Sequence, residues 1–145
     1  TVKFLGSVSD EKVTKIRMEV KNIVSRINPF VLKISETGCF SNPSKPSVLY
    51  LGVGGNIEAL KALVVKINDK MSQIGFKKDI ESFIPHITVA KINYPQKFNP
   101  DLSLFLNSTY DEVEFSVDKI QLLESKTLTE GVVYETLNTF SFLEK

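Results

Sequence analysis

The chain's only histidine lies in the stretch Pro85-His86-Ile87-Thr88-Val89-Ala90-Lys91, which has the pattern of a β-strand. The β-branched Ile87 and Val89 favour a strand, and they alternate with His86 and Thr88. Because side chains alternate across a strand, His86 and Thr88 are predicted on one face, about 6 to 7 Å apart. Two interpretations of this histidine are open: a group that acts at a site, or a hydrogen-bonded structural residue.

A second stretch of similar layout stands at the start of the chain, Thr1-Val2-Lys3-Phe4-Leu5-Gly6. As in residues 88–92, a threonine opens a run in which apolar residues alternate with others, and this pattern predicts a strand. Two such stretches lie far apart in the sequence, as they would in the two halves of a duplicated fold.

Together the two stretches resemble the motifs of the 2H phosphoesterase superfamily, which carries a His-x-Thr/Ser-x motif in each of two lobes. The closest similarity is to its RNA 2′,3′-cyclic phosphodiesterase branch, also called 2′-5′ RNA ligase. There the second motif commonly runs Pro-His-Ile-Thr-Leu-Ala-Arg, which residues 85–91 match except at Val89 and Lys91. The first commonly runs His-x-Thr-x-Lys-Phe-Leu-Gly, which residues 1–6 match from its threonine onward.

The resemblance covers the whole chain and includes three further stretches: Gly38-Cys39-Phe40-Ser41-Asn42-Pro43, Ile74-Gly75-Phe76 and Gly131-Val132-Val133-Tyr134-Glu135-Thr136-Leu137. It implies a first-motif histidine two residues before Thr1. We therefore expect residues 1–145 to form a single 2H phosphoesterase domain that lacks part of its N-terminal segment.

The order of predicted elements is that of an α+β protein with antiparallel sheets packed on helices. The resemblance implies two pseudo-symmetric lobes of antiparallel sheet and helix that flank a central cleft, with Thr1 facing His86 and Thr88 across it. From the residues we expect one helix that begins after Ser9 and ends before Asn28-Pro29, and a second helix over 57–74 that is ended by Gly75. Between them we expect a strand over 30–35, a turn-rich stretch over 36–47, and a strand over 48–53 that is buried on both faces. The last part of the chain is expected to form a short helix or turn over 101–107 and a hairpin of strands 113–123 and 132–142.

The activity that the resemblance implies is metal-free acid–base opening of a 2′,3′-cyclic phosphate to a 2′-phosphate. Histidine suits this work because its ordinary pKa lies near neutral pH, so that two histidines can hold opposite protonation states. His86 would be one of the two. Thr1 and Thr88 would donate hydrogen bonds to the non-bridging oxygens. With an RNA 5′-hydroxyl in place of water, the same chemistry makes or breaks a 2′-5′ linkage.

The resemblance also implies that the fifth residue after each motif histidine contacts the substrate. These positions are Phe4, which would stack on a base, and Lys91. Simple alternation turns Lys91 away from His86, so its role requires a bulge in the strand or a long reach. Lys3 shares the face of Thr1 in the predicted strand and is a second candidate cation for the phosphate.

Composition sets the remaining expectations. A net charge of +1 predicts no broad nucleic-acid-binding face, so an RNA or oligonucleotide end with a 2′,3′-cyclic phosphate is the expected partner. The single cysteine, Cys39, suits a reducing compartment, and we expect a cytoplasmic monomer with no membrane partner. One histidine and one cysteine predict no metal site, and we expect no cofactor.

Two other functions are compatible with the sequence. The first is a module of the same fold that binds RNA ends or nucleotides without catalysis. The second is a phosphodiesterase whose substrate is a small cyclic nucleotide.

Overall fold

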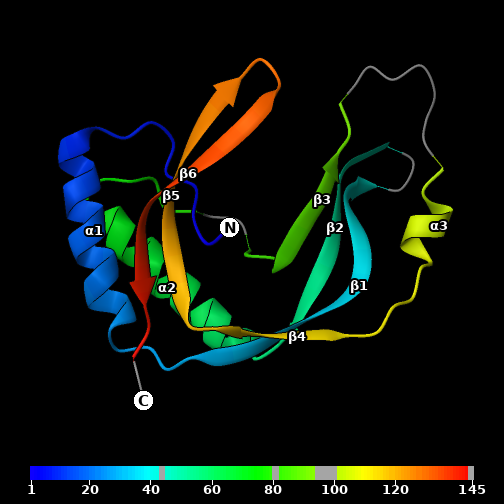
Figure 1. Cartoon of the computed structure of the whole chain (residues 1–145), viewed down its shortest axis with the longest axis horizontal. Coiled ribbons are helices and arrows are strands. Elements are labelled where there is room, and N and C mark those ends of the chain that lie inside the picture. The colour runs from blue at the N-terminus through cyan, green and yellow to red at the C-terminus, as the bar shows by residue number, and fades with distance from the viewer. Residues whose placement is uncertain (43–44, 80–81, 94–100, 144–145) are drawn as a thin grey trace. The chain divides into compact units, whose positions relative to one another are not determined.

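The computed structural model describes residues 1–42, 45–79, 82–93 and 101–143. The chain forms antiparallel sheets and helices, so the expected α+β class is confirmed (Figure 1). It divides into two compact units: unit 1 comprises Thr1–Phe30, Glu58–Ser82 and Ser116–Lys145, and unit 2 comprises Val31–Ile57 and Phe83–Phe115. In the described part of the chain, no helix is long and apolar enough to cross a membrane.

The core of unit 1 is formed by two helices and by aromatic residues near the chain's C-terminal end. Helix α1 (Asp10–Val24) and helix α2 (Ile57–Gln73) each bury one apolar stripe at the spacing of 3 to 4 residues that a helix requires. Glu19 of α1 pairs with Lys70 of α2. The ring of Phe142 stacks on that of Phe30 with their centroids 6.0 Å apart. The buried core residues of unit 1 include Ile16, Val20, Val24, Leu63, Val64, Ile67, Met71 and Phe140.

The helix ends agree in part with the sequence expectations. Gly75 has φ +91°, and the N–H of Phe76 donates to the carbonyl of Met71, so the predicted glycine stop after α2 is confirmed. Ser9 does occupy the N-cap position of α1, but its side chain makes no capping hydrogen bond.

The predicted C-terminal hairpin is confirmed as strands β5 (Lys119–Leu128) and β6 (Gly131–Ser141), which pair antiparallel. The single strand expected over 113–123 is wrong. It is divided at Asp118, because strand β4 (Val113–Val117) joins the larger sheet whereas β5 joins β6. A pattern in which apolar and polar residues alternate does not reveal that a chain changes partner sheets.

The strand expected over residues 1–6 is also wrong, since residues 1–9 form no helix or strand. A strand is defined by hydrogen bonds to a neighbouring strand. Within the described residues, this segment pairs with no strand.

Unit 2 is built on a sheet of order β3-β2-β1-β4, in which β1 is Phe30–Asn42, β2 is Lys45–Gly55 and β3 is His86–Lys91. Strand β2 pairs antiparallel with both β1 and β3. The turn-rich stretch expected over 36–47 is wrong for residues 36–42 and 45–47, because β1 continues through a bulge at Glu36 (φ +66°) and β2 begins at Lys45. Residues 43–44 lie outside the described part of the chain. Gly38, Ser41 and Asn42 are of residue types typical of turns, but here they lie within the long strand β1.

The expectation that strand 48–53 is buried on both faces is wrong as well, because these residues are all half-buried. In the described part of unit 2, the only helix is the short α3 (Ser103–Leu106), which confirms the helix or turn expected over 101–107. So short a helix cannot cover a face of the sheet.

Candidate functional site

His86 begins the edge strand β3, and its ring is fixed at one nitrogen. Nδ1 lies 2.7 Å from the carbonyl oxygen of Ile84. A carbonyl oxygen can only accept a hydrogen bond, so Nδ1 carries the proton of this bond. In the neutral imidazole the lone pair is therefore on Nε2, which is the atom left to take or give a proton.

Two aromatic rings from neighbouring strands surround this imidazole. The ring of Phe40 in β1 stands perpendicular to it, with an interplanar angle of 89° and centroids 4.8 Å apart. The ring of Tyr50 in β2 makes an interplanar angle of 63° with the imidazole, and the two centroids are 5.7 Å apart. Phe40 and Tyr50 also contact each other, with their centroids 4.6 Å apart. The side chain of His86 is half-buried among them.

Strand pairing places Thr88 on the same face of the sheet as His86. Gly52 of β2 lies opposite His86, and Tyr50 lies opposite Thr88. Opposite residues in an antiparallel pair point to the same side of the sheet. The alternation predicted from the sequence is therefore confirmed, and the hydroxyl of Thr88 shares a face with the imidazole and with the ring of Tyr50.

A bulge brings Lys91 onto this face. On β2 the chain advances one residue from Tyr50 to Leu49, while on β3 the partners change from Thr88 to Ala90. Val89 is thus the extra residue of a β-bulge, and beyond it Lys91 lies opposite Val48. Val48 and Tyr50 are two residues apart and share a face, so Lys91 lies on the face of Thr88 and His86. The bulge that its expected role requires is present.

The three candidate residues of the first motif lie in unit 1. The side chains of Thr1 and Phe4 are exposed, and Phe4 retains 78% of its accessible surface. Lys3 is placed differently. Its side chain is only 3% exposed, and its ammonium group contacts the Asn68 side chain, the Lys77 carbonyl and the Asp79 carboxylate. An ammonium has three N–H donors, so these contacts occupy the donors that a phosphate would need.

We expect Lys3→Met to lower the free energy of unfolding by about 1–3 kcal/mol, since it removes a shielded charge that bonds to three protein groups. Chemical denaturation monitored by circular dichroism measures the change. The exposed Lys66 provides a matched control, and Lys66→Met is expected to change stability by less than about 0.5 kcal/mol. Equal effects of the two substitutions would contradict a structural role for Lys3.

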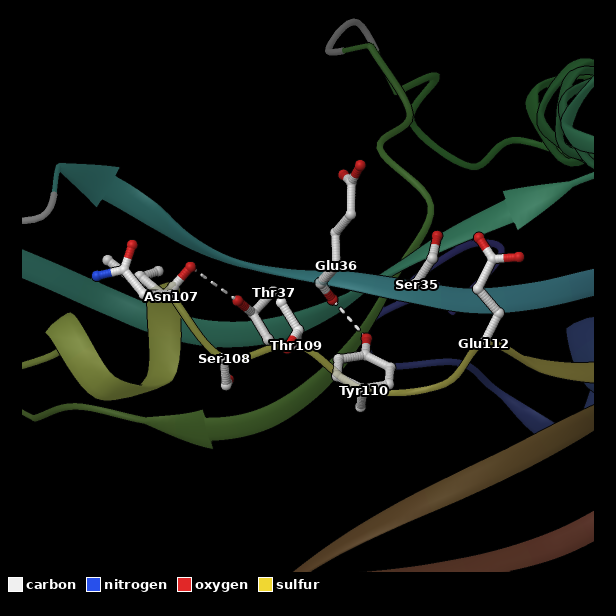
Figure 2. A pocket seen from close by; sticks show the side chains of 9 residues that line it. Ser35, Glu36, Thr37, Asn107, Ser108, Thr109, Tyr110 and Glu112 are labelled. Atoms are coloured by element: carbon white, nitrogen blue, oxygen red, sulfur yellow. Dashed lines mark hydrogen bonds between the residues drawn. The ribbon is translucent and has the colours of Figure 1, made fainter.

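A hollow of about 490 Å³ lies in unit 2 beside the bulge of β1, and Figure 2 shows its lining side chains. The hydroxyl of Tyr110 donates to the Glu36 carbonyl at 2.6 Å, and that of Thr37 donates to the carbonyls of Phe105 and Leu106 at 2.9 and 3.3 Å. These hydrogen bonds hold the bulge region to the end of α3 and to the segment that follows it. The hollow is lined by Ser35, Glu36, Thr37, Leu106, Asn107, Ser108, Thr109, Tyr110 and Glu112.

The hollow and His86 are connected by a row of residues that lie opposite one another on three neighbouring strands. Ser35 lies opposite Gly52, which lies opposite His86. A Cβ atom at Gly52 would stand 2.6 Å from the carbonyl oxygen of Ser35, so this row requires glycine in its middle position. At the same end of β1, a hydrogen bond from Lys33 to Glu112 (2.7 Å) raises the pKa of Lys33.

Sequence reasoning missed the contacts that Tyr50 and Gly38 make at this site. Tyr50 stands in a largely apolar strand, and Gly38 stands in a stretch that was expected to be a turn. Only the pairing of β2 with β3 brings Tyr50 near His86, and only the pairing of β1 with β2 places Gly38 opposite Tyr50. Within the described ranges, no group of three His, Cys, Asp or Glu side chains could hold a metal ion.

The fold has the α+β architecture of solved LigT-like structures. It resembles the crystal structure of TT0787 from Thermus thermophilus, with a TM-score of 0.78 and 22% identity over 98% of this chain and 76% of that chain. It also resembles E. coli LigT in its apo form, with a TM-score of 0.74 and 22% identity over 99% of this chain and 75% of that chain. Both similarities concern the fold alone.

The family follows from the sequence. The model of the 2′-5′ RNA ligase superfamily matches residues 1–128, and the chain belongs to this superfamily. Similar relatives include proteins named RNA 2′,3′-cyclic phosphodiesterase. The one from Methanocaldococcus jannaschii is 29% identical over 140 residues, which cover 94% of this chain and 76% of the relative. The one from Aeropyrum pernix is 29% identical over 139 residues, which cover 94% of this chain and 77% of the relative.

Proposed function

We propose that this protein is an RNA 2′,3′-cyclic phosphodiesterase that opens terminal cyclic phosphates to 2′-phosphates without a metal or cofactor. The observation that carries the proposal is the imidazole of His86, which has Nδ1 engaged by a carbonyl and Nε2 left for proton transfer. Thr88 and Lys91 share its face of the sheet. Membership of the superfamily and the similarity to relatives with this printed name support the same reaction.

The reaction needs two proton transfers. A water molecule attacks phosphorus and loses a proton, the bond from phosphorus to O3′ breaks, and O3′ takes up a proton. The product is a 2′-phosphomonoester with a free 3′-hydroxyl. His86 carries out one of these transfers through Nε2. The motif implies that the other belongs to a histidine two residues before Thr1. With an RNA 5′-hydroxyl instead of water, the same steps lead reversibly to a 2′-5′ linkage.

The remaining site residues bind the substrate. Negative charge builds on the non-bridging oxygens in the transition state, where the hydroxyls of Thr88 and Thr1 donate hydrogen bonds. Lys91 adds a positive charge near the phosphate, and the exposed ring of Phe4 stacks on a base. In the same proposal, the protein acts as a monomer in the cytoplasm, where the thiol of Cys39 stays reduced.

The test is hydrolysis of an oligonucleotide that ends in a 2′,3′-cyclic phosphate, with the protein carrying its native residues before Thr1. We expect turnover in the presence of EDTA and a 2′-phosphate product, identified by phosphorus NMR. A 3′-phosphate product, or activity that needs an added divalent ion, would contradict the proposal. Binding without turnover would indicate the non-catalytic module, and a clear preference for a cyclic mononucleotide would indicate a small-molecule phosphodiesterase.

Lys91 gives a charge-specific prediction. We expect Lys91→Met to lower kcat/KM about 10- to 100-fold, which corresponds to the loss of one hydrogen bond to a charged group. Lys91→Arg should retain or raise activity, because guanidinium donates two parallel hydrogen bonds to a phosphate. Steady-state kinetics on the cyclic-phosphate oligonucleotide measures both. Equal activity of the Met and Arg variants would show that the charge of Lys91 does not contact the substrate.

A further inference from the structure

We propose that Gly38, Phe40 and Tyr50 form an aromatic clamp that fixes the ring plane of His86 for proton transfer. The clamp consists of the rings of Phe40 and Tyr50 together with the glycine that lets them pack. All four residues belong to unit 2. The inference rests on the proposed role of His86. Gly38, Phe40 and Tyr50 act through this histidine and are therefore positioning residues.

The hydrogen bond to Ile84 is not sufficient to orient the imidazole. It restrains one distance, from Nδ1 to the carbonyl oxygen, whereas two rotatable bonds of the side chain, χ1 and χ2, set the direction in which Nε2 points. Proton transfer depends on where Nε2 points, and a displacement of about 1 Å can cost about 100-fold in rate. A second constraint on the plane is therefore needed.

The two aromatic rings supply that constraint. Phe40 stands perpendicular to the imidazole at 4.8 Å, which is the edge-to-face arrangement that aromatic rings prefer. Tyr50 contacts the imidazole from a second direction, at 5.7 Å and 63°. Because Phe40 and Tyr50 also pack on each other at 4.6 Å, neither ring can turn without moving the other. Their contacts oppose rotation of the imidazole plane.

Gly38 makes this packing possible. It lies directly opposite Tyr50 in the pairing of β1 with β2. A Cβ atom at Gly38 would stand 2.5 Å from Cζ and 2.6 Å from the hydroxyl oxygen of Tyr50. The tyrosine ring thus lies across the backbone of β1 at a position that only glycine leaves open. Any side chain here would force Tyr50 away from Phe40 and His86.

The test compares Gly38→Ala with Gly54→Ala. Neither glycine has a positive φ, so alanine introduces no backbone strain at either position. At Gly54 the new Cβ would meet Lys33 and Ser35 at 3.4 to 3.5 Å, which is ordinary contact. We expect Gly38→Ala to lower kcat by about 10-fold with KM nearly unchanged, and Gly54→Ala to leave both unchanged.

A spectroscopic measurement separates this inference from the proposed function. Nitrogen NMR of the single histidine reports whether the proton stays on Nδ1, and aromatic ring currents report the orientation of the ring. We expect both signals to change in Gly38→Ala and to stay as in the wild type in Gly54→Ala, whether or not the protein hydrolyses the oligonucleotide. A wild type without activity would overturn the proposed function alone. Unchanged histidine signals in Gly38→Ala would overturn the clamp alone.

Two further variants test the route through Tyr50 and keep the inference testable if Gly38→Ala does not fold. In a Tyr50→Ala background, Gly38→Ala should have no additional effect on kcat or on the histidine signals, because the obstructing ring is gone. Phe40→Leu should change the same signals and lower kcat by about 10-fold, whereas Phe40→Tyr should restore both. Additive effects of the pair, or equal behaviour of Leu and Tyr at position 40, would overturn the clamp.

Discussion

His86→Ala is expected to lower kcat for opening of a 2′,3′-cyclic phosphate by about 10²- to 10⁴-fold, the usual contribution of one positioned acid–base group. KM should change much less, because in the proposed reaction the imidazole transfers a proton and does not determine the affinity for RNA. The free energy of unfolding should fall by no more than about 1 kcal/mol. The side chain is half-buried at the start of an edge strand, so its loss leaves no cavity in a core.

Substitution of His86 by asparagine or glutamine distinguishes a structural role of the side chain from a role in proton transfer. The amide nitrogen of asparagine stands where Nδ1 stood and can still donate to the Ile84 carbonyl. The amide of glutamine reaches toward the place of Nε2, but it neither takes nor gives a proton at neutral pH. We expect both variants to fold as the wild type does and to be as inactive as His86→Ala. If either turned over the cyclic phosphate at the wild-type rate, His86 would be a structural histidine.

Local patterns were sufficient where neighbours in the sequence determine the structure. The apolar stripes of α1 and α2 and the stop at Gly75 depend on spacing within about 20 residues, and they were predicted correctly. The shared face of His86 and Thr88 follows from alternation alone, which is again a local property.

The errors in the course of the strands have a different origin, because each depends on a partner strand. The chain leaves one sheet for another at Asp118, and β1 continues through the bulge at Glu36 to pair with β2. In both places the residue types are compatible with either structure. Pairing between distant segments makes the choice, and the sequence pattern does not contain that information.

The site shows the same division. The sequence predicts that His86 and Thr88 share a face and that Lys91 needs a bulge to join them, but it does not locate that bulge at Val89. The neighbours of His86 are harder still, since Phe40 and Tyr50 come from two other strands. Lys3 was expected at the phosphate, yet its ammonium is surrounded by protein acceptors in unit 1. A side chain of four carbons reaches too many alternative partners for its sequence position to decide between them.

Thr88→Val is expected to lower kcat by about 10²- to 10³-fold, the cost of removing one donor that stabilises charge in the transition state. Valine has nearly the shape of threonine and favours β-strands, so the strand itself should persist. Thr88 is exposed and lies opposite Tyr50 on the face of His86, where the proposed reaction places the phosphate. Kinetics on the cyclic-phosphate oligonucleotide measures the loss, and circular dichroism confirms the fold.

Thr88→Ser is the matched control for the hydroxyl. Serine keeps the donor and loses only a methyl group, so its kcat should stay within about 10-fold of the wild type, whereas valine keeps the methyl and loses the donor. This order, in which serine is far more active than valine, follows only if the hydroxyl contacts the reacting phosphate. The opposite order would mean that Thr88 serves to pack the strand, and phosphate stabilisation would then have to come from Lys91 and Thr1 without it.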